Sequence, residues 1–200
     1  MNELYFITGH HAVGKTYLVN QLQQLNPAFV HFDTGPEVRA IYKNAKTVLS
    51  FKEWEKTNTM KYGDHFVDNL LCEKLKSLPL SDNDILLITG FRSLEGIAYT
   101  ARQLNIGNPK IVYIDSIYPL MKENYEKREN KILTDKEFIK LLAEENKRGL
   151  NCIKKYVNNN TQTCKLLYNL DNKSLVDKFL DFTTEVIRGK NEKQINILNN

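Results

Sequence analysis

Residues 9–16 combine two glycines with a Lys-Thr pair, a spacing that suits polyphosphate binding. Gly9 and Gly14 let the backbone wrap a polyphosphate, with N–H groups pointing inward at the mouth of a helix. Lys15 then reaches the β- and γ-phosphates, and the Thr16 hydroxyl is placed to ligate Mg²⁺. The positions between the glycines, which border the nucleotide, are His10, His11, Ala12 and Val13. The pattern predicts a site for ATP and Mg²⁺, with Thr16 as the metal ligand.

The segments on either side of this run support the interpretation. An apolar run over residues 4–7 precedes it, and Leu18, Leu22 and Leu25 follow at helical spacing. A strand before the glycines and a helix after them distinguish a phosphate-binding loop from a glycine-rich turn that happens to end in Lys-Thr. We therefore expect the loop to connect the first strand to the first helix.

A second group of polar residues follows the next apolar run, where Asp33-Thr34-Gly35 precedes Arg39. This element resembles the (D)-[ST]-G-x-x-x-R element of nucleoside monophosphate kinases, the adenylate and cytidylate kinase group. The resemblance implies that Thr34 and Gly35 lie beside the acceptor nucleotide and that Arg39 grips its phosphate, for which a guanidinium fork is well matched. Alternatively, these residues form a turn in which Asp33 or Thr34 caps a helix, with Pro36 near its start.

A third element, Thr89-Gly90-Phe91-Arg92, follows another apolar run. It is similar to D-G-F-P-R of adenylate kinases and to D-G-I-R-S of dephospho-coenzyme A kinase-like proteins. The resemblance implies close backbone approach at Gly90 and a second phosphate clamp at Arg92; a surface ion pair is the alternative for Arg92. Thr89 replaces the acid of the family, which helps to hold the water shell of Mg²⁺. Asp33 is the best available substitute, as an outer-shell partner of the metal or as a base for an acceptor hydroxyl.

The charged segment before Thr134 resembles the lid region of the same kinases. The family carries R-x-x-x-R there, and the two arginine positions fall on Asn124 and Arg128. The resemblance implies that Arg128 faces the phosphates and that Arg148 reaches back across the lid. The arginine that stacks on the donor base in these kinases is replaced by Asn124. The lid, at about residues 125–134, is too short for a zinc-bearing insertion. A solvated helix face is the alternative reading of these charges.

We expect no chemical role for Glu144, Glu145 or the three cysteines. Glu144 and Glu145 are expected to be helix charges that pair with Lys147 and Arg148. The three cysteines are widely separated and show no C-x-x-C spacing, so idle thiols in a reducing compartment are expected.

Composition narrows the class of protein. The chain has 200 residues, 42% of them hydrophobic, which suits one globular domain with a full core. A net charge of +4 suits phosphorylated small molecules and is too weak to predict a nucleic-acid partner. No apolar run reaches membrane-spanning length and no leader is apparent, so we expect a cytoplasmic protein with no membrane partner, either a monomer or a homodimer.

Apolar strand-like runs alternate with amphipathic helical stretches along the chain. This alternation predicts a parallel sheet of about five strands with helices on both faces. Together with the glycine loop, the resemblance to the kinases implies an α/β three-layer P-loop NTPase fold with a short helical lid. We expect a P-loop kinase domain over residues 1–188, with a helical acceptor-binding arm at about 36–78. Residues 189–200 are polar and are expected to form a disordered tail.

Together, the motifs and the resemblance predict an enzyme that moves the γ-phosphoryl group of Mg·ATP to a nucleoside or deoxynucleoside monophosphate. Lys15, Asp33, Arg92 and Arg128 are its expected catalytic residues. One alternative is a dephospho-coenzyme A kinase-like enzyme or another small-molecule kinase. A second is a regulatory protein that binds ATP without catalysis, as the changes at Thr89 and Asn124 suggest.

Overall fold

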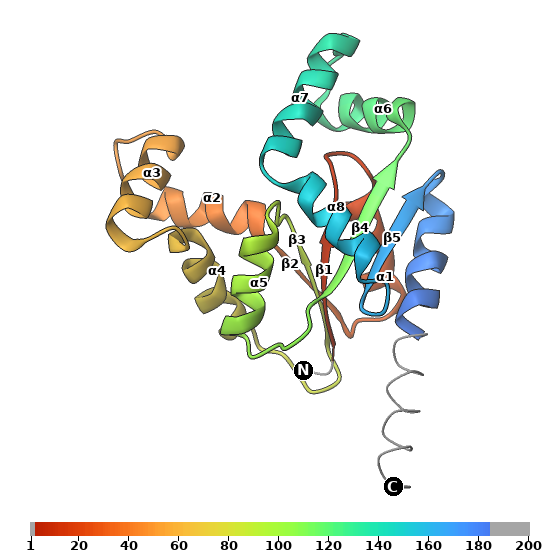
Figure 1. Cartoon of the computed structure of the whole chain (residues 1–200), viewed down its shortest axis with the longest axis horizontal. Helices are drawn as coiled ribbons and strands as arrows, with labels where there is room; N and C mark the ends of the chain where they lie inside the picture. The colour runs from red at the N-terminus through yellow and green to blue at the C-terminus, as the bar shows by residue number, and fades with distance from the viewer. Residues whose placement is uncertain (1–2, 185–200) are drawn as a thin grey trace, which may run out of the picture.

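The computed structural model describes residues 3–184, and its centre is one parallel β-sheet. Its strands are β1 (Glu3–Thr8), β2 (Phe29–Asp33), β3 (Ile85–Thr89), β4 (Lys110–Ser116) and β5 (Cys164–Asn169). Their order across the sheet is β2-β3-β1-β4-β5, and every neighbouring pair is parallel (Figure 1). Parallel strands covered on both faces need nearly continuous apolar sequences, which explains runs such as Ile85–Ile88. The predicted five-stranded parallel sheet is confirmed.

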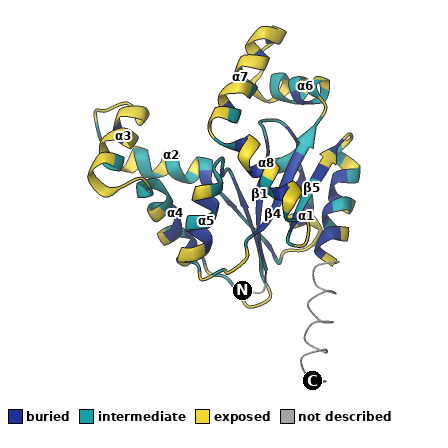
Figure 2. Cartoon of the chain, in the orientation of Figure 1, coloured by how far each residue is buried: buried dark blue, intermediate teal, exposed yellow. Residues whose placement is uncertain are grey.

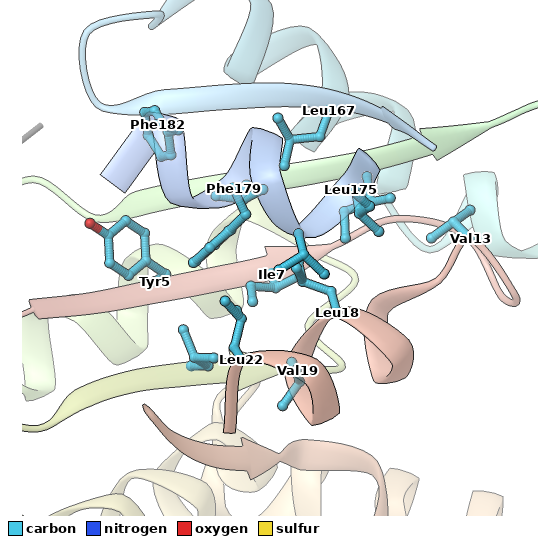
Figure 3. Packing of buried hydrophobic residues seen from close by; sticks show 14 of the residues in the cluster. Tyr5, Ile7, Val13, Leu18, Val19, Leu22, Leu167, Leu175, Phe179 and Phe182 are labelled. Atoms are coloured by element: carbon cyan, nitrogen blue, oxygen red, sulfur yellow. The ribbon is translucent and has the colours of Figure 1, made fainter. Parts of the chain in front are cut away.

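Helices cover both faces of the sheet. They are α1 (Lys15–Leu25), α2 (Thr34–Asn44), α3 (Phe51–Tyr62), α4 (Phe66–Lys76), α5 (Leu94–Gln103), α6 (Tyr118–Glu129), α7 (Asp135–Lys147), α8 (Leu150–Asn159) and a further helix over residues 172–184. Alternate residues of β1 point to opposite faces: Tyr5 and Ile7 pack with α1 and the helix over 172–184 (Figure 3), whereas Phe6 belongs to the core beneath α4, α5 and α8. Two buried layers, visible as the dark centre of Figure 2, therefore hold the strand ends in place.

Three helices, α2 to α4, occupy the expected arm; α4 packs on the sheet beside α5, and α3 lies farthest from the strands (Figure 1). The arm is divided at Ser50, which forms a capping box with Glu53 at the start of α3. Trp54 is buried in an aromatic cluster with Tyr42 and Phe66. The arm therefore has a small core of its own, and its contact with an acceptor remains a prediction.

Helices α6 and α7 project beyond the carboxyl end of β4 (Figure 1). A capping box between Thr134 and Glu137 opens α7, and residues 130–134 make the short connection from α6. No helix among residues 3–184 is both long and apolar enough to cross a bilayer. The tail expected at 189–200 lies outside the described residues.

Candidate functional site

The loop between β1 and α1 has the backbone shape that its glycines predict. Gly9, Ala12 and Gly14 have positive φ angles of 137°, 62° and 99°. A Cβ atom on Gly9 would lie 2.1 Å from the Ile114 carbonyl oxygen, and one on Gly14 would lie 2.6 Å from Asn169 Nδ2. Since α1 begins directly after the loop, its first N–H groups lack intrahelical partners. The arrangement fits a bound polyphosphate.

Two asparagines hold this loop from other elements. Asn169 at the end of β5 donates a hydrogen bond from Nδ2 to the Val13 carbonyl at 2.9 Å. Asn124 in α6 donates one to the Ala12 carbonyl at 3.2 Å. At the position where adenylate and cytidylate kinases have a base-stacking arginine, this chain therefore has Asn124, which contacts the loop backbone. Thr16 lies exposed in the first turn of α1, with its metal-binding role still a prediction.

Lys15 folds back over the loop. Its Nζ atom donates hydrogen bonds to the carbonyl oxygens of Gly9 and His10 at 2.7 and 2.6 Å. Burial is the main cause that lowers the Lys15 pKa to about 8, and the positive charges of Arg92 and Arg128 add to it. A bound anion would raise the Lys15 pKa again by stabilising the ammonium, so this side chain suits a site that binds phosphate.

Both loop histidines contact α7. His10 Nε2 lies 2.8 Å from Asn146 Oδ1, and its Nδ1 lies 3.3 Å from the Tyr113 hydroxyl. The His11 backbone N–H donates to Glu145 Oε2 at 2.8 Å. The two histidines are therefore tied to consecutive residues in the last turn of α7.

The position and partners of Glu145 differ from those that we predicted. Its expected pairing with Lys147 and Arg148 on a helix surface is wrong, because Glu145 is only 4% exposed. One carboxylate oxygen, Oε1, lies 3.3 Å from His11 Nε2 and 3.7 Å from Arg92 Nε. The available signal was spacing: Glu145 stands seven residues after the apolar Phe138 and so shares its helix face.

Arg92 lies in the β3–α5 connection and contacts the loop between β1 and α1, residues 9–14, which we call the nucleotide loop. Its Nη2 atom lies 3.1 Å from His11 Nε2. Because a guanidinium only donates, this His11 nitrogen accepts the hydrogen bond. Burial lowers the His11 pKa to about 4 despite the nearby Glu145, so the ring is neutral at pH 7. The ion pair considered for Arg92 is present, but its partner is the buried Glu145, and the guanidinium also contacts the loop through His11.

A second set of predicted residues comes together at the carboxyl ends of β2 and β3. The Asp33 carboxylate accepts a hydrogen bond from the Gly35 N–H at 3.1 Å and caps α2, so the capping interpretation is also correct. A Cβ atom on Gly35 would lie 3.5 Å from Arg39 Nη1, and one on Gly90 would lie 2.2 Å from Thr34 Oγ1. We call these five residues the strand-end cluster.

Thr89, where the family has an acid, is buried and bonded within the sheet. Its Oγ1 atom lies 2.8 Å from His31 Nε2. Asp33 is the residue paired with Thr89 in the β2–β3 register, so an acid is present one strand away. Its negative charge raises the pKa values of Lys15 and Arg92, although burial lowers both overall.

Magnesium binding would depend on few protein ligands. Residues 3–184 contain no group of three or more His, Cys, Asp and Glu side chains that could hold a metal ion. Mg²⁺ commonly uses one or two protein ligands together with water and substrate phosphates. The roles of Thr16 as a metal ligand and of Asp33 as an outer-shell partner therefore stay predictions.

For Arg128 and Arg148, the arginines expected to act in the lid, the structure gives less direct support than for Arg92. Arg128 donates from Nε to Glu129 at 2.8 Å, lies over the Tyr125 ring, and is half exposed. Its charge nevertheless lowers the pKa of Lys15 and of His11. Arg148 caps the end of α7 and its charge lowers the Arg92 pKa. The solvated-face interpretation describes Arg128 in this conformation, and its role in a closed lid remains a prediction.

Comparison with known proteins identifies the fold. No protein-family model matches the chain, and no curated protein matches it. A solved structure that matches is a gluconokinase from Sinorhizobium meliloti 1021, with a TM-score of 0.60 and 8% identity, covering 96% of this chain and 97% of that chain. The chain therefore has the P-loop kinase fold. At this identity the likeness does not distinguish nucleoside monophosphate kinases from other kinases of the same fold.

Proposed function

We propose that this protein transfers the γ-phosphoryl group of Mg·ATP to a nucleoside or deoxynucleoside monophosphate. The observation that carries the proposal is the contact of Arg92, from the β3–α5 connection, with His11 of the nucleotide loop. An arginine at this place can bind phosphate beside Lys15 and stabilise the charge of phosphoryl transfer.

The donor side of the proposed site consists of the loop, Lys15 and Thr16. The loop N–H groups and the Lys15 ammonium bind the triphosphate, and the Thr16 hydroxyl is available to Mg²⁺. The metal, when bound, neutralises charge that builds on the phosphate oxygens. Val13 and Ala12 are fixed by Asn169 and Asn124, so the loop is preorganised for this anion.

The acceptor side is the strand-end cluster. Arg39 is exposed, and among residues 3–184 no carboxylate forms a salt bridge with its guanidinium. The guanidinium lies over Gly35, where the backbone leaves the end of β2. A free guanidinium at the carboxyl edge of a parallel sheet suits an anionic acceptor such as a nucleotide phosphate.

A hydroxyl acceptor is the second candidate. Asp33 has a carboxylate at the strand ends, and its charge acts on both Lys15 and Arg92. A carboxylate in this position can accept the proton of a hydroxyl during phosphoryl transfer. The matching structure is named a gluconokinase, so gluconate and dephospho-coenzyme A belong among the acceptors to be tested.

The two candidates are separated by ADP release from ATP with a panel of acceptors. We expect ADP release to depend on a nucleoside monophosphate, and Arg39→Ala to raise its KM without loss of ATP binding. Arg102→Ala, an exposed arginine at the far end of α5, is the matched control and should leave the KM unchanged. Release driven by gluconate or dephospho-coenzyme A would favour the second candidate. ATP binding without acceptor-dependent release would instead support a regulatory protein.

A further inference from the structure

Glu145 is a buried carboxylate that lies between the nucleotide loop and Arg92. We propose that Glu145 is a positioning residue, whose carboxylate holds the Arg92 side chain beside the nucleotide loop for phosphoryl transfer. This inference rests on the proposed kinase function and adds a residue that the motifs do not contain. Three observations support it, from its contacts, its charge and the backbone around Arg92.

The two carboxylate oxygens have separate partners. Oε2 accepts the His11 backbone N–H at 2.8 Å, which fixes the carboxylate to the loop. Oε1 lies 3.7 Å from Arg92 Nε, while Arg92 Nη2 donates to the His11 ring at 3.1 Å. Glu145 and the His11 ring therefore hold the same guanidinium on two sides.

The charges around Glu145 are mainly positive. Lys15 in the loop, Arg92 after β3, Arg128 in α6 and Arg148 after α7 all act on this region. Asp33 at the end of β2 is the other acid that acts on Lys15 and Arg92. A buried carboxylate is retained where cations pair with it, and here the cations are the groups proposed to bind phosphate.

The segment that follows Glu145 also holds the Arg92 backbone. Gly149, between α7 and α8, has a positive φ of 114°. A Cβ atom there would lie 2.9 Å from the Arg92 carbonyl oxygen. Residues 145–149 thus constrain Arg92 at both its side chain and its backbone, and long flexible side chains need such support to act with precise geometry.

A double-mutant cycle tests the proposal. Glu145→Gln keeps an acceptor for the His11 N–H but removes the charge, and Glu144→Gln is an exposed neighbour with the same change. We expect Glu145→Gln to lower the acceptor kcat/KM by roughly 10- to 100-fold. In an Arg92→Gln background the same change should cost less than about twofold, because its partner is already gone. Equal losses in both backgrounds, or equal effects of Glu144→Gln and Glu145→Gln, would overturn the inference.

A second measurement does not need turnover. Phenylglyoxal modifies accessible guanidinium groups, and mass spectrometry of the Arg92 peptide reports the rate at this residue. We expect modification of Arg92 to be severalfold faster in Glu145→Gln than in Glu144→Gln, and an unchanged rate would also overturn the inference. If the wild-type protein shows no acceptor-dependent ADP release while Arg92 still becomes more reactive, the proposed function fails and the Glu145–Arg92 contact stands. If Glu145→Gln alone does not fold, the Glu145→Gln/Arg92→Gln variant, which lacks both paired charges, should fold again, and its failure to fold would overturn the inference.

Discussion

The Lys15 ammonium is destabilising in the absence of phosphate, so Lys15→Met should make the ligand-free protein more stable. Burial lowers the Lys15 pKa from 10.5 to about 8. At about 1.4 kcal/mol per pKa unit, this shift corresponds to at most about 3 to 4 kcal/mol of destabilisation at pH 7. Methionine also loses the hydrogen bonds to the Gly9 and His10 carbonyls, worth about 1 kcal/mol each. The expected net stabilisation is therefore about 1 to 2 kcal/mol at most.

The stabilisation by Lys15→Met should depend on pH, because the Lys15 pKa differs between the folded and unfolded states. Below pH 8 Lys15 is protonated in the folded and unfolded states, so the wild-type protein bears the full penalty. Between pH 8 and 10.5 the unfolded state holds more protons than the folded state, so wild-type stability rises with pH. The advantage of Lys15→Met should therefore shrink above pH 8 and reverse near pH 9, where the remaining penalty equals the contribution of the two hydrogen bonds.

Urea unfolding at pH 7 and near pH 10 measures both effects. Lys52→Met, an exposed lysine in α3, is the matched control and should change the free energy of unfolding by less than about 0.5 kcal/mol. ATP binding by Lys15→Met should be lost, since the ammonium is a proposed phosphate ligand. A Lys15→Met protein that is less stable at pH 7, or a difference that does not change with pH, would refute the reasoning.

Three further predictions concern the strand-end cluster. Gly90→Ala places a Cβ atom 2.2 Å from Thr34 Oγ1 at a φ of 101°, and should cost about 2 to 4 kcal/mol in thermal unfolding. Gly63→Ala, with a φ of 94°, a ψ of 168° and open space, should cost roughly 1 to 3 kcal/mol from backbone strain alone, and thus shows what strain costs without a collision. Arg39→Ala should raise the acceptor KM on the order of tenfold and change ATP affinity less than about twofold, as steady-state kinetics and titration would show. Asp33→Asn should lower kcat by about 100-fold or more with a hydroxyl acceptor; a smaller loss would argue against a base at this position.

The sequence was sufficient for the fold and the nucleotide loop because both depend on local patterns. Continuous apolar runs such as Ile85–Ile88 predict buried parallel strands, and the spacing of Gly9, Gly14 and Lys15 predicts the loop. The capping boxes at Ser50 and Thr134 mark the starts of helices in the same way. Each of these features is determined within a few residues of chain.

The support of the site was not predictable from local patterns. Asn169 and Asn124 contact the loop across 156 and 112 residues of chain. Glu145 looks like its neighbour Glu144 in a charged helix, and the only local signal for its burial is the helix face that it shares with Phe138, which does not name its partners. The roles of Arg39, Arg92 and Arg128 remain predictions, although Arg92 lies in contact with the loop.

The most direct test of the proposed function follows the γ-phosphate itself. ATP labelled at the γ-position is incubated with nucleoside and deoxynucleoside monophosphates, and the products are separated by chromatography. The proposal predicts label in a nucleoside diphosphate, at a rate that Arg92→Gln lowers by roughly 100-fold or more. Label that stays in ATP, or that appears as inorganic phosphate at the same rate with and without an acceptor, would contradict it.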